Sequence, residues 1–209
     1  MMSEKYIQNY SNWCWAVACK MVGEQYKTMN PIYNFTLGYN KDIEWQNCLC
    51  NGSSFDIDVA KEIDVWQAAI VMNANTIMPG TIGNFPGDDE AKIRGIKYVV
   101  TGECNSKKID VMNLGTYDMQ ENLLDQYGEE IKTVFRSKNY IIGNAVLSPW
   151  NVCHSFVLMD ISDNMVKVYD PWNGTIDMYN IQDVFERGFI SAKGIGVIKW
   201  IQFINCGIE

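Results

Sequence analysis

Four runs rich in β-forming residues follow one another near the end of the chain, and they constrain the fold more than any other feature. They are YIIGNAVLS (140–148), HSFVLMDIS (154–162), MVKVYDPW (165–172) and GIGVIKWIQFI (194–204). Pro, Asn, Asp and Gly residues separate them, which is typical of consecutive antiparallel strands. The sequence therefore predicts an antiparallel sheet toward the C-terminus.

Helical patterns come before this sheet. The first expected helix spans residues 12–26, with Ser11 as its N-cap and Cys14 in its first turn. A second helix is expected within DIDVAKEIDVWQAAIVM (56–72), where apolar residues recur at helical spacing. A third is expected within residues 117–139, where an acidic cap precedes an apolar face made of Leu123, Leu124, Tyr127, Ile131, Val134 and Phe135.

The order of these patterns, helices first and strands last, predicts an α+β fold. A length of 209 residues and a hydrophobic content of 47% suit one domain with its own core. No repeat or Pro/Gly/Ser-rich linker divides the chain, so we expect a single domain over residues 1–209. Residues 28–117 match no motif and stay unassigned, and within them AKIRGIKYVV (91–100) is compatible with a helix or a strand.

The charge of the chain excludes one class of partner. A net charge of −8 and the lack of any Lys/Arg cluster argue against nucleic-acid binding and favour a peptide or small polar substrate. The acidic run GDDE (87–90) is interpreted as a solvated loop, with selection of basic substrate residues as the alternative.

No segment resembles a membrane anchor or an export signal. The apolar runs are shorter than the roughly 18 residues that a membrane helix needs, so we expect no membrane span. The N-terminal residues MMSEKYIQNY lack the apolar core of a signal peptide. We therefore expect a cytoplasmic protein, with secretion after removal of a signal or pro-segment as the alternative.

Seven cysteines make an odd number, so at least one thiol must be free, and reduced thiols are the default expectation. Cys48 and Cys50 have C-x-C spacing instead of the C-x-x-C spacing typical of zinc sites, and no second pair follows them. We therefore expect neither a metal nor another cofactor.

Cys14 stands between two tryptophans in QNYSNWCWAVACKMV (8–22), at the start of the first expected helix. A thiolate attacks carbonyl carbon far better than a thiol does, and a helix N-terminus stabilises the negative sulfur through its free N–H groups and its dipole. The alternative is a buried apolar cysteine, as most free cysteines are. The stretch around Cys14 leaves both interpretations open.

The chain contains one histidine, His154, which lies 140 residues after Cys14. A cysteine nucleophile needs an imidazole that holds a proton and later delivers it to the leaving amine. The separation agrees with the roughly 130 to 150 residues between cysteine and histidine in papain-like proteases, whereas caspases place the histidine about 50 residues before the cysteine. His154 is therefore the candidate base.

Asp170 is the candidate partner of this imidazole. His154 opens one expected strand and Asp170 closes the next, so a hairpin through the turn SDN (162–164) would bring the two residues side by side. A carboxylate there would orient the imidazole and stabilise its charged form. The alternative is that Asp170 only caps the turn before Pro171.

The segments QNYSNWCWAVACKMV, NVCHSFVLMDIS and VYDPWNG together resemble the papain superfamily of cysteine peptidases, and most of all the bacterial leader-processing (peptidase C39-like) and effector-type members with an NWCWA nucleophile motif. The resemblance covers residues 6–27 and 118–185. It implies a papain-like fold with Cys14 on the helical half, packed on a sheet half that carries His154 and Asp170.

The same resemblance implies a role for Gln8, because these enzymes carry a glutamine six residues before the cysteine that helps to form the oxyanion hole. Three tryptophans are candidates for substrate contact. Trp13 and Trp15 flank the cysteine, although core packing is the commoner role of tryptophan, and Trp172 is a candidate to cover the pair of His154 and Asp170.

The expected function is a cysteine endopeptidase that cleaves a peptide bond through a thioester. Two alternatives stay open: an inactive papain-like binding or regulatory module, and a thiol acyltransferase of the transglutaminase type. The intact Cys14 and His154 speak against the first alternative, and the long gap between these residues speaks against the second.

Overall fold

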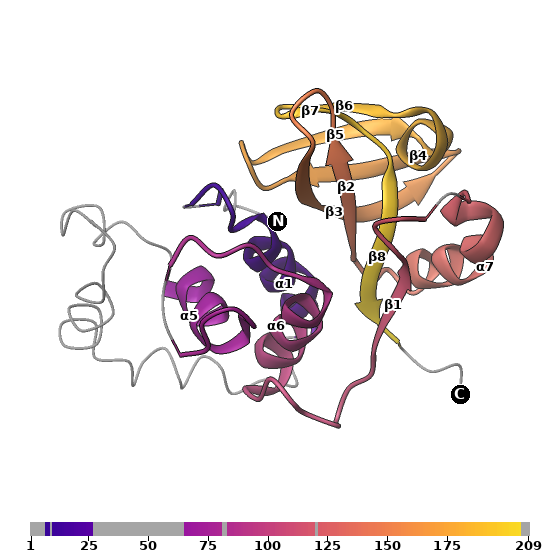
Figure 1. Cartoon of the computed structure of the whole chain (residues 1–209). Helices are drawn as coiled ribbons and strands as arrows, with labels where there is room; N and C mark the ends of the chain where they lie inside the picture. The colour runs from indigo at the N-terminus through magenta and orange to yellow at the C-terminus, as the bar shows by residue number, and fades with distance from the viewer. Residues whose placement is uncertain (1–6, 9, 27–64, 81–82, 120, 206–209) are drawn as a thin grey trace.

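The computed structural model describes residues 7–8, 10–26, 65–80, 83–119 and 121–205, which form an α+β structure (Figure 1). The first part of the second expected helix, together with Cys48, Cys50 and Cys206, lies outside the described residues. The helices are α1 (Cys14–Glu24), α5 (Val65–Ala74), α6 (Asp89–Thr101), α7 (Leu123–Arg136) and the short π-helical turn η2 (Asp183–Arg187). The strands are β1 (Val111–Gly115), β2 (Ile141–Leu147), β3 (Val152–Ser162), β4 (Met165–Asp170), β5 (Thr175–Asn180), β6 (Phe189–Ser191), β7 (Gly194–Gly196) and β8 (Ile198–Ile204).

The predicted antiparallel sheet is confirmed. Its six strands lie in the order β1-β8-β2-β3-β4-β5, and every neighbouring pair is antiparallel. The four predicted runs correspond to β2, β3, β4 and the pair β7 and β8, which Val197 separates. The sequence did not predict β1, β5 and β6, which are short or half-exposed and so lack a strong apolar pattern.

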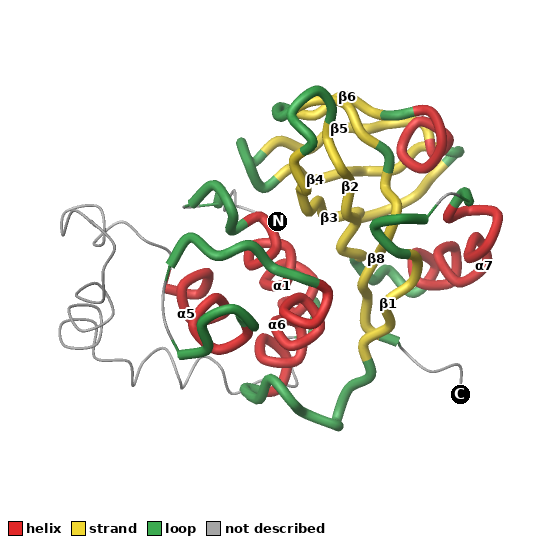
Figure 2. The backbone as a smooth tube through the Cα atoms, in the orientation of Figure 1, coloured by secondary structure: helices red, strands yellow, loops and turns green. Residues whose placement is uncertain are grey.

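Helices cover both faces of the sheet (Figure 2), with α1, α5 and α6 beside one face and α7 beside the other. Successive side chains of β3 point to opposite faces of the sheet, so this strand packs against helices on both sides. Its Val157 and Met159 pack in the cluster with α1, while Phe156 and Leu158 pack in the cluster with α7. The chain therefore buries two hydrophobic clusters, one on each side of a shared sheet.

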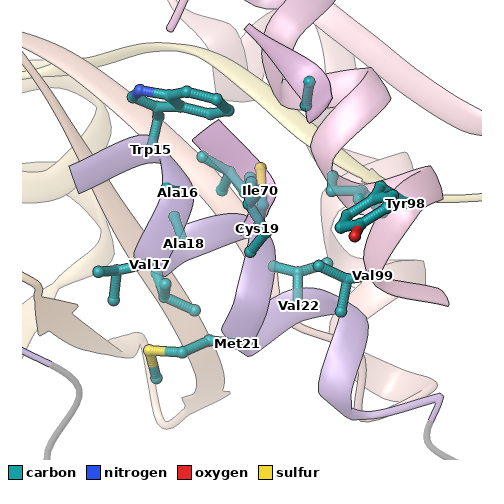
Figure 3. Close-up of a cluster of buried hydrophobic side chains, with 14 of the residues drawn as sticks. Trp15, Ala16, Val17, Ala18, Cys19, Met21, Val22, Ile70, Tyr98 and Val99 are labelled. Carbon is teal, nitrogen blue, oxygen red and sulfur yellow. The ribbon is translucent and has the colours of Figure 1, made fainter. Parts of the chain in front are cut away.

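Helix α1 is buried along nearly its whole length. Its residues from Cys14 to Gly23 are all buried, which fits a helix enclosed on all sides by other elements. Figure 3 shows Cys19 of this helix beside Ile70 of α5, and Val22 facing Val99 of α6. A Cβ on Gly23 would lie 2.3 Å from a methyl carbon of Val99, so this close approach of α1 to α6 requires glycine.

The helix caps differ from the sequence expectations. The N-cap of α1 is Trp13, without a side-chain cap, and Ser11 instead accepts a hydrogen bond from the Asn84 carboxamide. Helix α7 is capped by Asn122, whose side chain accepts from the Leu124 N–H, and not by an acidic residue. Tertiary contacts of the 83–87 segment override the local capping preference of Ser11.

The ambiguous run 91–100 is helical, and the acidic run before it begins α6 and is not a free loop. Asp88 is the N-cap and accepts from the Ala91 N–H at 2.7 Å. Asp89 and Glu90 lie in the first turn, where carboxylates stabilise the positive end of the helix dipole. In the part of the chain that the structure describes, no helix has the length and hydropathy needed to cross a membrane.

Candidate active site

A loop at residues 83–87 holds the start of α1 in place. The indole N–H of Trp13 donates to the Gly83 carbonyl at 2.8 Å, and that of Trp15 donates to the Phe85 carbonyl at 3.1 Å. Asn12 adds two hydrogen bonds to Asn84, one from its backbone N–H and one from its carboxamide. These contacts position Cys14 as the first residue of the helix.

The β3–β4 hairpin positions His154 and Asp170. Its turn residues, Asp163 and Asn164, have φ values of 49° and 63°, as a two-residue type I′ turn requires. The strand pairing extends to Val157 and Tyr169, and the two candidate residues lie just beyond this pair at the same end of the hairpin. The turn that the sequence predicted therefore brings them together.

His154 and Asp170 form a buried pair. The imidazole Nε2 lies 2.7 Å from Oδ1 of Asp170, and the two residues are 2% and 5% exposed. The same Oδ1 accepts the backbone N–H of Trp172 at 2.9 Å, which fixes the carboxylate. The rings of His154 and Phe156 are nearly perpendicular, with a centroid distance of 4.5 Å. The other ring nitrogen, Nδ1, is buried and has no hydrogen-bond partner among the described residues.

The Cys14 sulfur lies where α1 meets β3. It is 7% exposed and accepts the backbone N–H of Ser155 at 3.5 Å. Burial by itself raises the pKa of the Cys14 thiol. The charge of His154, the Ser155 N–H and the charge of Lys92 outweigh burial and lower this pKa to about 7.

The pKa of His154 moves the other way. Burial by itself lowers it, but the charge of the Cys14 thiolate and the hydrogen bond to Asp170 raise the pKa of His154 to about 9. Burial by itself raises the pKa of Asp170. The hydrogen bond to His154 acts against burial, and the net result is a pKa below the usual value of an aspartate. Because the thiol loses its proton more readily than the imidazolium does, the pair favours thiolate and imidazolium at neutral to mildly alkaline pH.

A small cavity of about 50 Å³ opens beside Cys14. Residues from α1, α6 and the sheet surround it, and the 83–87 loop supplies one wall. Part of this wall comes from the region that the sequence left unassigned. The lining residues are Asn12, Cys14, Trp15, Pro86, Gly87, Lys92, Asn144, Cys153, His154, Ser155 and Trp200.

Gln8 does not line this cavity. Its carboxamide Nε2 donates to the carbonyls of Tyr10 and Ser11 at 2.7 and 2.9 Å, so both of its N–H groups are engaged. Its backbone N–H donates to the Pro171 carbonyl at 2.8 Å, which ties the N-terminal segment to the chain after Asp170. In this geometry Gln8 has no donor directed at a substrate oxygen, in contrast to the role expected from the resemblance.

The three tryptophans have different positions. Trp13 is fully buried against Tyr10 and does not line the cavity, so it packs in the core and is not placed to touch substrate. Trp15 is also buried but forms part of the cavity wall. Trp172 is partly exposed, next to Asp170 in sequence, and Lys193 lies over its ring at 3.4 Å from the centroid.

Several residues of the site were not found from the sequence. Asn144 donates to the Trp200 carbonyl and to Gln202, and accepts from the Ser155 hydroxyl, so it joins three strands behind the cavity. Lys92 is buried beside the cavity although lysine is rarely buried. No local pattern marks these residues, because their partners lie far away in the sequence.

The site offers a nucleophile and a base. Among the described residues there is no group of three or more His, Cys, Asp or Glu side chains that could hold a metal ion. The four described cysteines, Cys14, Cys19, Cys104 and Cys153, are free thiols.

No family model matches the chain, and no significant match was found among curated proteins.

Proposed function

We propose that this protein is a cysteine peptidase of the papain-like type, acting on a peptide or protein substrate through a thioester. The observation that carries the proposal is the buried cluster of three groups: the Cys14 sulfur from α1, the His154 imidazole from β3 and the Asp170 carboxylate from β4. The lowered pKa of Cys14 and the raised pKa of His154 support it, since they favour the reactive ion pair.

In the first step the Cys14 thiolate attacks the carbonyl carbon of the scissile peptide bond, and the carbonyl oxygen becomes an oxyanion. Because Nε2 of His154 is engaged with Asp170, the proton for the leaving amine comes from Nδ1. When the C–N bond breaks, the amine takes this proton and leaves, and the acyl group stays on sulfur as a thioester.

In the second step neutral His154 removes a proton from water, and the resulting hydroxide attacks the thioester carbonyl. The C–S bond breaks, the acid product leaves, and the thiolate and imidazolium are restored. Asp170 keeps the ring orientation through the 2.7 Å contact and stabilises the imidazolium in both steps.

The oxyanion needs hydrogen-bond donors. The N–H groups in the first turn of an α-helix have no acceptor within the helix, so the start of α1 supplies donors beside the Cys14 sulfur. Gln8 can join them by exchanging one of its bonds to the Tyr10 or Ser11 carbonyl for a bond to the substrate oxygen. The backbone N–H of Trp172 holds the Asp170 carboxylate in place beside His154.

The test is cleavage of a peptide library by the wild-type protein and by Cys14→Ala. We expect cleavage by the wild type and none by Cys14→Ala, because the pKa of Cys14 is lowered, whereas burial raises the pKa of Cys153, the other thiol of the cavity. Cys153→Ala is the matched control, since it removes the neighbouring thiol of the same cavity and should leave cleavage intact. Equal cleavage by wild type and Cys14→Ala would place the chemistry elsewhere.

A further inference from the structure

Lys92 is a buried cation in the wall of the cavity that holds Cys14 and His154. It lies on α6 and is only 3% exposed. Burying an ammonium group is costly unless charged or polar partners replace its water, so its partners matter. Among the described residues, the partners of Lys92 are Asp89, whose Oδ1 lies 3.5 Å from Nζ, and Trp200, whose ring centroid lies 5.6 Å from Nζ.

Asp89 only partly satisfies this ammonium. The contact of 3.5 Å is long for a charge-assisted hydrogen bond, which is normally below about 3 Å. Oδ1 of Asp89 also accepts closer bonds from the Trp200 indole at 2.8 Å and from Gln202 at 3.2 Å. The carboxylate is 40% exposed as well, so solvent screens its charge. An ammonium has three N–H donors, and Lys92 therefore has donors left for a ligand.

The cavity has the right size for a small anionic group. A volume of about 50 Å³ holds roughly three to five waters at about 10 to 15 Å³ each, which is close to the four heavy atoms of a carboxymethyl group. Trp15, Pro86 and Trp200 supply apolar walls for the carbon atoms of such a group. Apart from His154, Lys92 is the one basic side chain among the lining residues.

We propose that Lys92 is the specificity-determining residue of this site, and that the preferred substrate presents a carboxylate in the cavity beside Cys14. The carboxylate comes from an Asp or Glu side chain close to the scissile bond or from the end of the peptide chain. This inference rests on the proposed peptidase function and names its substrate class. The chain as a whole carries a charge of −8, so an acidic substrate depends on a local cation such as Lys92.

The first experiment compares matched peptides with the wild type, Lys92→Met and Lys92→Arg. Each pair exchanges Asp for Asn or Glu for Gln at one position around the cleavage site, and a further pair exchanges a free C-terminal carboxylate for an amide. We expect one acidic position, or the free terminus, to raise kcat/KM about tenfold or more, as a charged hydrogen bond does.

Which pair responds tells the two sources of the carboxylate apart. The preference should disappear in Lys92→Met, persist in part in Lys92→Arg, and stay unchanged in Lys132→Met, which removes a charge on the exposed surface of α7. Equal cleavage of both members of every pair by the wild type would overturn the proposal even if no variant folded.

The second experiment needs no peptide cleavage. Cys14 is alkylated with iodoacetate, which is an anion, and with iodoacetamide, which is neutral, and the modified peptide is quantified by mass spectrometry. We expect the ratio of the two rates to fall several-fold in Lys92→Met and to stay constant in Lys132→Met. A changed pKa of Cys14 alters both rates equally and cancels in the ratio. A general loss of both rates with a constant ratio would overturn the proposal.

The two proposals can fail separately. If no peptide is cleaved but the alkylation ratio falls in Lys92→Met, the peptidase proposal fails and the carboxylate site stands. If peptides are cleaved without charge preference and the ratio is constant, the carboxylate site fails and the peptidase proposal stands. Thermal unfolding of each variant checks that it is folded.

Discussion

At the scale of single residues, the site consists of groups that change one another's protonation. Cys14, His154 and Asp170 are all buried, and burial alone would favour their neutral forms. Their mutual contacts shift the three pKa values the other way, so the thiolate, the imidazolium and the carboxylate are favoured although the site is buried. A buried group whose pKa is shifted by a specific partner in a cavity is a frequent mark of a functional site.

The pH dependence of Cys14 alkylation follows from these shifts. The thiolate forms as pH rises through about 7, the pKa of Cys14, and the imidazolium is lost as pH rises through about 9, the pKa of His154. We expect the iodoacetamide rate to rise through the first value, and peptide cleavage to be highest between the two, because cleavage needs both charged forms. A stopped-flow rate profile measures this, and a single rise at the pKa of an ordinary thiol would contradict it.

Asp170→Asn separates the orientation of His154 from its charge. The asparagine oxygen can still accept from Nε2, so the ring should keep its position, but the negative charge that raises the pKa of His154 is lost. We expect the alkaline limb of the activity profile to move to lower pH, and kcat/KM to fall about tenfold per pKa unit of lost stabilisation. Asp170→Ala, which removes the hydrogen bond too, is the control and should lose more activity.

At the scale of elements, the site depends on how closely α1 can approach its neighbours. Helix α1 packs against α6 on one side and against β3 on the other, and its first residue carries the nucleophile. Glycines allow the first of these contacts: Gly23 of α1 lies against Val99, and Gly95 of α6 lies against Cys19. A methyl group at either position would push α1 away from α6.

Gly23→Ala should therefore destabilise the protein. The added Cβ would lie 2.3 Å from Val99, and overpacking of this kind costs about 1 to 3 kcal/mol. Gly128→Ala on α7 is the matched control, because a Cβ there meets nothing within 4 Å and alanine favours a helix interior by roughly 0.5 to 1 kcal/mol. Thermal unfolding should show a lower Tm for the first variant and an equal or higher Tm for the second. A loss of the same size in both would contradict the packing argument.

At the scale of the whole molecule, the site forms where helices from the first half of the chain meet the sheet from the second half (Figure 1). Cys14 comes from α1, the 83–87 loop and Lys92 come from the middle of the chain, and His154 and Asp170 come from one hairpin. Since no element contains more than two of these residues, the site exists only when both halves are packed together.

The sequence alone determined the features that depend on neighbouring residues. The β-rich runs and their turns predict the strands and the β3–β4 hairpin, and so the placement of His154 and Asp170 at the same end of it. The register shift between Leu158 and Asp160, which lies between the turn and this pair, was not predicted. The start of α1 was predicted to within two residues, with Cys14 in its first turn. Residue chemistry alone indicated which thiol and which imidazole to consider.

Only the tertiary structure decided what surrounds those residues. Ser11 and Gln8 carry suitable groups for a helix cap and an oxyanion hole, but contacts with Asn84, and with nearby carbonyls, occupy them here. The burial of Lys92 beside Cys14 depends on α6 packing against α1 and the sheet. The physical reason is that cavities and buried charges arise from contacts between residues far apart in the chain, and no local pattern in the sequence records such contacts.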